Sequence, residues 1–295
     1  MSAAGWIVLA GVLTGVACGL VGSFLVLRRM AMLGDAISHA VLPGIAVAFL
    51  ITHSRQSVTM LIGAALVGLL TVFIVDVLQR RGRLQHDASI GVTFTFLFAL
   101  GVILISVFGR YVDLDQDCVL FGEIAFVPWD TWMIGGTDLG PRAVWSLGAA
   151  LIVNILFILL FYKELKIISF DPVLARSLGV PVTAIHYGLM GCVALTTVAA
   201  FESVGAILVV AMLVVPAAAA YLLSEKLWRM IALSALIGGA SALLGFFSAA
   251  ALDVSISGMM ATAAGALFTM TFTFHLLRKR MRTREIAESP TVQHS

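Results

Sequence analysis

Two ionisable residues, Asp35 and His39, lie four positions apart in a stretch, MAMLGDAISHAVLPGIAVAFLI, that is otherwise apolar enough for a membrane. A carboxylate and an imidazole are costly inside hydrocarbon, so such a pair indicates a functional site. On a helix, residues four apart share one face and lie one turn from each other. The pair therefore offers an oxygen and a nitrogen to one point in space, which suits a first-row divalent metal better than an organic substrate.

The depth of this pair fits a transported ion. His39 follows Arg29 by about ten residues, hence on the order of 15 Å into the bilayer and near its midplane. We predict that Asp35 offsets the charge of a metal in transit and that neutral His39 binds it. The remaining ligands come from water, backbone or another span, and incomplete coordination lets the ion leave. The alternative is an Asp–His hydrogen bond that only packs the bundle.

Other polar residues in or beside the spans are weaker candidates. Glu202, in FESVGA at an outer junction of two spans, is either a third metal ligand or a solvated carboxylate at a helix end. Asp253 is expected to cap a helix, and Asp76 to pair with Arg80 one turn away. Two histidines are expected near the cytoplasmic ends of their spans, where a ring reaches the interface: His186 and His275.

The composition is that of a polytopic helical membrane protein. The 295 residues are 61% hydrophobic with a mean hydropathy of +1.07, and only 12% are charged. The net charge of +2 is distributed by topology and forms no basic face for nucleic acid. Apolar runs of membrane-spanning length recur along the chain. We predict an all-α fold with nine spans, at residues 6–27, 31–52, 57–78, 90–109, 142–162, 184–201, 204–223, 229–252 and 256–277.

The basic residues predict the orientation. One alternating set of connections, together with the C-terminal tail, carries 15 of the 18 Lys and Arg residues, and the opposite set carries Arg55, Arg110 and Arg142. Cytoplasmic loops are the ones rich in Lys and Arg, so the N-terminus is expected outside and the C-terminus inside. Residues 1–280 are predicted to form one transmembrane domain, and residues 281–295 a polar cytoplasmic tail without fixed structure. The apolar piece CVLFGEIAF in the long outer segment 110–141 is a candidate interfacial helix.

The energy source must lie outside this chain or in an ion gradient, because the sequence has no G-x-x-x-x-G-K-[ST] phosphate loop. The inside segment 163–188 suggests a borrowed ATPase. Asp171 is a good N-cap, Pro172 suits the first helical position, and Gly179 is a natural stop. The segment thus predicts a short helix over 173–178 that docks to a partner through one side, with its coupling residues at Asp171, Pro172, Leu174, Ala175, Leu178 and Gly179.

Three stretches together resemble the bacterial ABC-3 family of metal ABC-transporter permeases for manganese, zinc or iron. RRMAMLGDAISHAVLPGIA resembles the family signature RRM-x-L-x-GD-x-x-SH-x-x-x-PG. FDPVLARSLGV resembles the FDPE-x-A-x-x-LGV coupling segment, and VGAILVVAMLVVPAAAA resembles a third family segment. The resemblance covers essentially the whole chain. It departs at Val173, where the family has Glu, and in LDVSISG, which lacks the usual proline.

The resemblance implies a fold similar to the permeases for vitamin B12 and haem, dimerised around a central path in a bacterial inner membrane. It implies three kinds of partner: cytoplasmic ATP-binding subunits, a second permease copy or a sister permease, and an extracytoplasmic metal-binding protein. The chain would then be a transporter subunit without an ATPase site or a permanent cofactor, importing a divalent metal. The piece LFGEIAFVPWD is similar to members encoded beside a second permease and favours manganese or iron, although the ligand types suit manganese, zinc and iron alike.

Two other functions fit parts of the sequence. A secondary cation transporter would use Asp35 and His39 as a proton-coupled pair and would work without an ATPase; the coupling segment argues against it. An intramembrane metalloprotease would need a fuller ligand set and a base, such as HExxH, which the sequence lacks.

Overall fold

The computed structural model describes residues 2–52, 57–108, 123–134 and 137–288. Within these residues, nine helical segments are long and apolar enough to cross a membrane, which confirms the predicted spans to within a few residues. The spans in order are α1 (Ala3–Leu27), α2 with α3 (Ala31–Ala40 and Leu42–Thr52), α4 (Ser57–Gly82), α5 (His86–Phe108), α7 (Arg142–Leu160), α10 (Val182–Val204), α11 (Ala206–Leu223), α12 (Leu227–Leu252) and α13 (Ile256–Glu288).

The core lies around α1, which packs against α12, α11, α7 and α10. Its contact with α12 depends on small residues. Gly15 and Gly238 face each other so closely that a Cβ on either would overlap the carbonyl of the other. Gly11 and Gly19 lie one turn to each side of Gly15, and Ser234 donates its hydroxyl to the Gly19 carbonyl at 2.8 Å. Such small-xxx-small faces let membrane helices approach backbone to backbone.

The second span is two helices rather than one. The helix ends at Ala40, Val41 forms the joint, and α3 begins at Leu42. Pro43 explains the break, because it has no N–H to donate to the carbonyl of His39 four residues earlier. Two amides, those of Gly44 and Ile45, instead donate to the carbonyl of Val41 at 2.9 and 3.1 Å. The break therefore falls directly after the metal-candidate pair.

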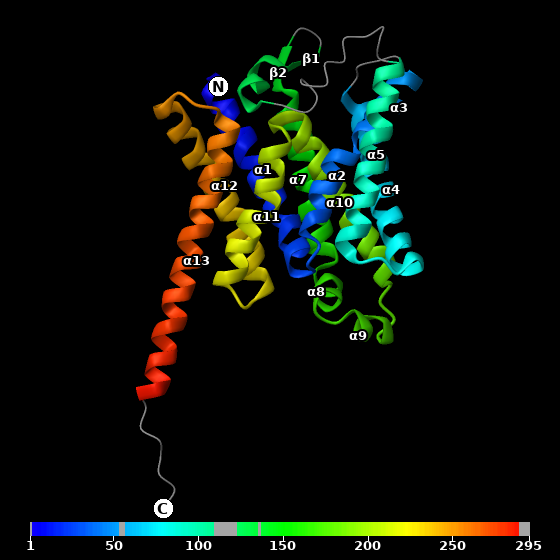
Figure 1. Cartoon of the computed structure of the whole chain (residues 1–295). Coiled ribbons are helices and arrows are strands. Elements are labelled where there is room, and N and C mark those ends of the chain that lie inside the picture. Colours follow the sequence, from blue (N-terminus) through cyan, green and yellow to red (C-terminus); the bar gives the residue numbers. More distant parts are fainter. Residues whose placement is uncertain (1, 53–56, 109–122, 135–136, 289–295) are drawn as a thin grey trace, which may run out of the picture.

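The two ends of the bundle differ, as Figure 1 shows. The N-terminus lies at the end that carries a 3-10 helix, η2 (Ile124–Trp129), and an antiparallel hairpin of β1 (Thr131–Ile134) and β2 (Thr137–Pro141), in which Thr131 pairs with Pro141. The described part of the chain finishes at the opposite end, where α13 ends at Glu288, in agreement with an odd number of spans. The sequence did not predict the hairpin. Part of the predicted interfacial helix in CVLFGEIAF is found as η2, and residues 118–122 lie outside the described residues.

The connection from α7 to α10 contains two short helices at the end away from the N-terminus (Figure 1). The predicted short helix is confirmed as α9 (Pro172–Ser177). It is preceded by α8 (Tyr162–Phe170), which the sequence analysis missed and which packs against α9. Asp171 lies between the two helices and is the N-cap of α9, because its side chain accepts hydrogen bonds from the amides of Val173 and Leu174.

The last helix is longer than predicted. It continues to Glu288, so the prediction of a tail without structure from residue 281 is wrong for residues 281–288; residues 289–295 lie outside the described part. The segment MRTREIAE contains neither glycine nor proline, and most of its residues are good helix formers, so the helix has no reason to stop at the end of the apolar run. In Figure 1 this helix leans away from the other spans toward its C-terminal end.

Candidate metal site and coupling segment

Asp35 and His39 face each other on α2, as their spacing predicts. The His39 Nε2 atom lies 3.5 Å from the Asp35 Oδ1 atom. Each side chain is 35% exposed, so neither is sealed in the core. Ser38, next to His39 in the sequence, donates its hydroxyl to the backbone carbonyl of Asp35 at 2.6 Å and so makes no claim on the Asp35 carboxylate.

The spacing of the two atoms suits ligands of one ion. Metal–nitrogen and metal–oxygen bonds of about 2.0 to 2.2 Å at a tetrahedral angle place the two ligand atoms about 3.4 Å apart. The nitrogen and oxygen of the pair are already at 3.5 Å. A direct N–H···O hydrogen bond would draw them closer, to about 2.9 Å. An ion could therefore be bound by small side-chain adjustments, without movement of the helix.

The pair lies on an exposed stripe of α2. Met32 precedes Asp35 by three residues and is 60% exposed, and His39 follows by four, so all three share one helix face. The other side of His39 is bordered by Phe94 and Phe98 of α5, whose ring centroids lie 6.0 and 6.2 Å from that of the imidazole. Asp35 and His39 are thus partly exposed on the surface of the single chain, and the two aromatic rings restrict the approach of an ion from the α5 side.

The structure does not supply a third strong ligand to this pair. The described part of the chain contains no group of three or more His, Cys, Asp and Glu side chains that could hold a metal. Glu202 is exposed near the end of α10, three residues before Gly205, which adopts a φ of +83°. Its role as a third metal ligand stays a prediction. Asp253 is the C-cap of α12, as predicted.

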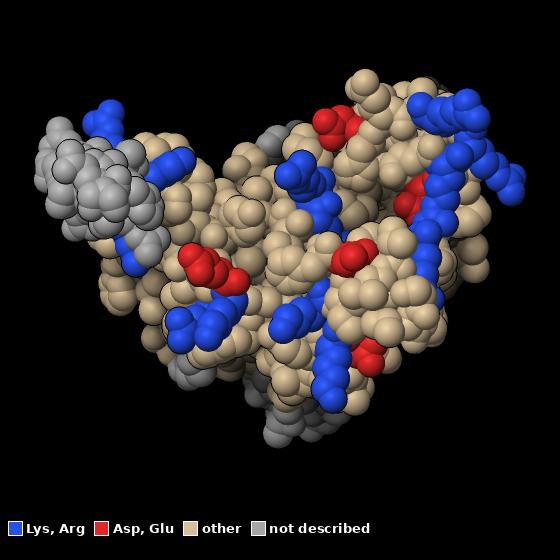
Figure 2. All heavy atoms as spheres, turned by 90° about the horizontal axis from the view of Figure 1, so that it is seen from below, with Lys and Arg blue, Asp and Glu red and all other residues tan. Residues whose placement is uncertain are grey.

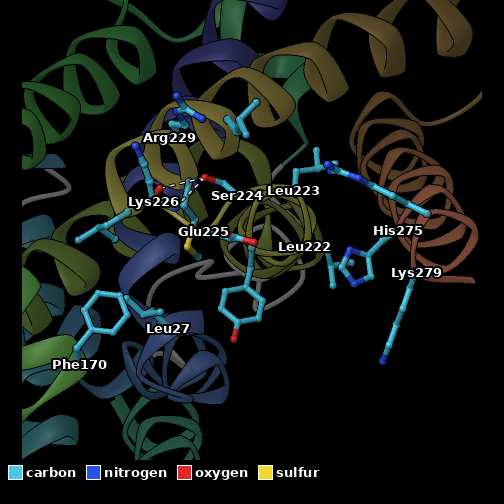
Figure 3. Close-up of a pocket in the computed structure, with 15 residues that line it drawn as sticks. Leu27, Phe170, Leu222, Leu223, Ser224, Glu225, Lys226, Arg229, His275 and Lys279 are labelled. Carbon is cyan, nitrogen blue, oxygen red and sulfur yellow. Dashed lines mark hydrogen bonds between the residues drawn. The ribbon is translucent and has the colours of Figure 1, made fainter. Parts of the chain in front are cut away.

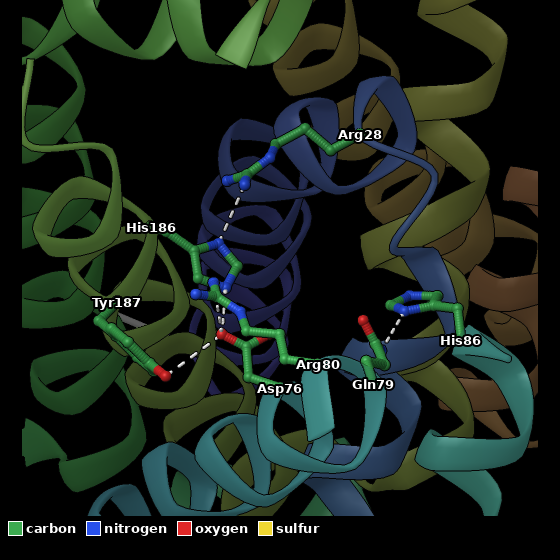
Figure 4. A network of polar contacts seen from close by, with 7 residues as sticks. All are labelled: Arg28, Asp76, Gln79, Arg80, His86, His186 and Tyr187. Carbon is green, nitrogen blue, oxygen red and sulfur yellow. Dashed lines mark hydrogen bonds and ion pairs between the residues drawn. The ribbon is translucent and has the colours of Figure 1, made fainter. Parts of the chain in front are cut away.

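A partly buried polar network joins Arg28, the C-cap of α1, to α4 and α10, as Figure 4 shows. Arg28 donates to Nδ1 of His186 at 3.0 Å, so the ring proton is on Nε2, which faces Asp76 Oδ2 at 3.6 Å. The hydroxyl of Tyr187 donates to the same oxygen at 3.2 Å, and Arg80 approaches it at 3.5 Å. Burial lowers the pKa of the Arg28 guanidinium, and the Asp76 carboxylate counteracts that shift.

This network corrects one prediction and extends another. The pairing of Asp76 with Arg80 is confirmed, but His186 does not reach to the interface: it is only 6% exposed and hydrogen-bonded. The signal for the network was Asp76 itself, an acid within a span. Its partners come from α10 and from the turn that precedes α2, and sequence spacing could not identify them. The network thus connects α10, the helix that follows α9, to Arg28, which precedes Asp35 by seven residues.

The coupling segment presents an apolar edge. Ala175 is fully buried against the rest of the loop, whereas Leu174 and Leu178 are 50% and 62% exposed. Asp171 caps α9, Pro172 is its first residue, and Gly179 has a φ of +77°, the left-handed conformation that ends a helix. Two exposed leucines on a short, well-capped helix are suited to a groove on a partner protein.

The end of the molecule that carries α9 is also the basic end. Figure 2 shows this face, with Lys and Arg side chains spread across it and fewer acidic ones between them. The orientation was predicted from these same Lys and Arg residues, so the assignment of this end to the cytoplasm stays a prediction. The distribution is broad rather than concentrated in one patch.

The family described as the ABC 3 transport family matches residues 3–275. The manganese transport system membrane protein MntD of Bacillus subtilis is 56% identical over 287 residues, covering 96% of this chain and 97% of that protein. The zinc transport system membrane protein TroD of Treponema pallidum is 44% identical, over 91% of this chain and 73% of that protein.

Solved structures agree with this relationship. PsaBC from Streptococcus pneumoniae, solved in complex with Fab, superposes with a TM-score of 0.76 at 34% identity, covering 92% of this chain and 91% of that one. An inward-facing metal-chelate type ABC transporter superposes with a TM-score of 0.61 at 17% identity, over 91% of this chain and 85% of that one, and shows the fold alone.

Proposed function

The chain belongs to the ABC 3 transport family, and we propose that it is the membrane-spanning permease subunit of an ATP-driven importer of a divalent transition metal, with manganese as the favoured ion. The observation that carries the proposal is the Asp35–His39 pair, partly exposed and spaced for one ion within an otherwise apolar span. The relatives named for manganese and zinc support a metal as the cargo. Iron remains within the chemistry of the same ligand types.

The exposed stripe of Met32, Asp35 and His39 implies a neighbour. Hydrocarbon does not solvate a carboxylate, so this face lines a path that contains water or is covered by another protein. A second permease, either a copy or a sister chain, would close the path and supply further ligands. The ion would then pass between two chains by alternating access, with water or backbone oxygens completing a coordination shell that is loose enough to release it.

Energy would come from ATP-binding subunits that dock on α9. Leu174 and Leu178 would insert into a groove on the ATPase, and the capped helix would transmit its movement to α10, which begins at Val182. The chain itself would hydrolyse nothing. An extracytoplasmic metal-binding protein would deliver the ion at the opposite end, where η2 and the hairpin lie.

Metal uptake with a disabled ATPase distinguishes this proposal from a secondary transporter. Cells expressing the chain with its ATPase and metal-binding partners should accumulate radiolabelled manganese, with unlabelled zinc and iron as competitors that rank the ions. Replacing the phosphate-loop lysine of the ATPase subunit should reduce uptake to background, because the gradient alone does not drive this permease. Uptake that persists with the inactive ATPase, and that collapses with a proton uncoupler, would establish the secondary transporter instead.

Two neighbouring substitutions on α9 test the docking surface with the same added charge. Val173→Glu should keep at least wild-type uptake, because the resemblance places Glu at this position and the side chain is 73% exposed. Leu174→Glu should reduce uptake at least about 10-fold, since it puts a carboxylate into an apolar contact that would be desolvated on docking. Both chains should reach the membrane in equal amounts on immunoblots. Equal uptake by the two variants would mean that Leu174 does not enter a partner's groove.

A further inference from the structure

A pocket of about 1050 Å³ lies at the basic end of the bundle, between α13 and the turn that joins α11 to α12 (Figure 3). Its lining shows how deep it lies in the membrane. Leu27 is the last residue of α1, Leu223 the last of α11, and Leu227 the first of α12. The α13 wall, from His275 to Lys279, lies where the apolar run of that helix gives way to RKR. The pocket is therefore at the boundary between hydrocarbon and water.

The lining combines positive charge with an apolar wall. Four cationic side chains border it, two from the start of α12 and two from α13: Lys226, Arg229, Arg278 and Lys279. Among the lining residues in the described part of the chain, Glu225 carries the opposing negative charge. The first amides of α12 add to the positive field, because no side chain caps this helix and its N-terminus begins in the pocket. The group that fits such a site carries a negative charge and an apolar body.

Exposed apolar side chains continue from the pocket along α12 and α13. Leu236 on α12 and Phe274 and Leu277 on α13 are 68%, 56% and 54% exposed. At the rim, Arg229 lies over the ring of Trp228 at 5.3 Å, and that tryptophan is 56% exposed. Tryptophan and snorkelling Arg side chains are typical of the membrane–water interface. Charged groups below and apolar side chains above match the two parts of a phospholipid.

We propose that this pocket binds the phosphate headgroup of an anionic phospholipid in the leaflet on the basic side of the membrane, with the acyl chains lying along α12 and α13. Basic pockets between spans are known to bind acidic lipid headgroups by this combination of charge and shape. The shared chemistry, a phosphate, could also come from a soluble anion. The apolar residues that continue from the pocket into the span region favour the lipid.

The experiment uses the full-length chain, purified in mild detergent with the subunits that accompany it. It is titrated with dioleoyl phosphatidylglycerol and with the zwitterionic phosphatidylcholine, and bound lipid is counted by native mass spectrometry. The test variant replaces Lys226, Arg229, Arg278 and Lys279 with Gln. The matched control removes the same charge from exposed residues of the same face that do not line the pocket: Arg81, Arg83, Lys163 and Lys166.

The wild type and the control should bind phosphatidylglycerol at least about 10-fold more tightly than phosphatidylcholine, and the test variant should lose that preference. Glu225→Gln, which removes the opposing charge without removing a cation, should tighten phosphatidylglycerol binding, and it keeps the proposal testable if the fourfold variant misfolds. Equal losses in test and control variants would overturn the site. Competition by millimolar inorganic phosphate would assign it to a soluble anion. Lipid binding that appears only after the ATPase subunits are removed from the complex would assign it to a protein interface.

Discussion

Replacing His39 with Ala should abolish metal uptake, by at least about 100-fold, while the chain still reaches the membrane and still assembles with its ATPase. His39 Nε2 and Asp35 Oδ1, which lie 3.5 Å apart, are the two ligands that we propose for the ion. Removing one of them leaves a single carboxylate, which binds a dehydrated divalent ion far more weakly than a nitrogen and an oxygen together. Asp35→Asn should be nearly as severe, because it preserves shape but removes the charge that offsets the ion.

Met32→Ala is the control on the same helix face. Met32 is 60% exposed and one turn from Asp35, so this substitution disturbs the same stripe without removing a nitrogen or oxygen ligand. We expect uptake within about twofold of wild type. Radiolabelled manganese uptake, normalised to membrane levels and to ATPase copurification, measures all three variants. Wild-type uptake by His39→Ala would show that the pair only packs the bundle, and the ion path would then have to be sought elsewhere, beginning at Glu202.

The parts of the fold that follow from local pattern were predictable. Apolar runs determined the nine spans, and Asp171, Pro172 and Gly179 determined α9 through capping and φ preferences. The break at Val41 follows from Pro43, which cannot donate a backbone N–H, whereas the apolar run alone predicts one continuous span over residues 31–52. The predictions of helices failed where polar segments showed no apolar periodicity. The helix α8 and the helical extension to Glu288 carry enough polar residues to be taken for loop or tail.

The candidate site also has one part that follows from local sequence and another that depends on tertiary packing. Asp35 and His39 are one turn apart on one helix, so their proximity is a local property that the sequence specifies. The network of Arg28, His186 and Asp76 is different, because its members are separated by many residues and are brought together by the packing of α1, α4 and α10. No spacing rule predicts such a contact. The direction in which the pair faces, outward from the chain, likewise depends on tertiary packing.

Replacing Gly15 with Leu should prevent stable folding, or lower the melting temperature by at least about 6 °C. Gly15 touches the backbone of Gly238, and a Cβ there would overlap the Gly238 carbonyl, so neither side can yield by changing a rotamer. Overpacking in a tight core costs roughly 1–3 kcal/mol, and more when backbones must separate. Each kcal/mol lowers the melting temperature of a chain of this size by about 2–4 °C. Thiol labelling of buried Cys18 on α1 during heating, in a chain with its other cysteines replaced, reports the opening directly.

Gly148→Leu separates the packing effect from the change in residue type. Gly148 lies within α7, and a Cβ added there meets nothing within 4 Å, so the larger side chain projects into open space at the helix surface. The intrinsic preference of Leu over Gly in a helix favours the folded state by about 0.5–1 kcal/mol. This control should therefore melt at or above the wild-type temperature. If both variants melted alike, the α1–α12 contact would not limit stability, and the close approach of Gly15 to Gly238 would be incidental to how the bundle is held together.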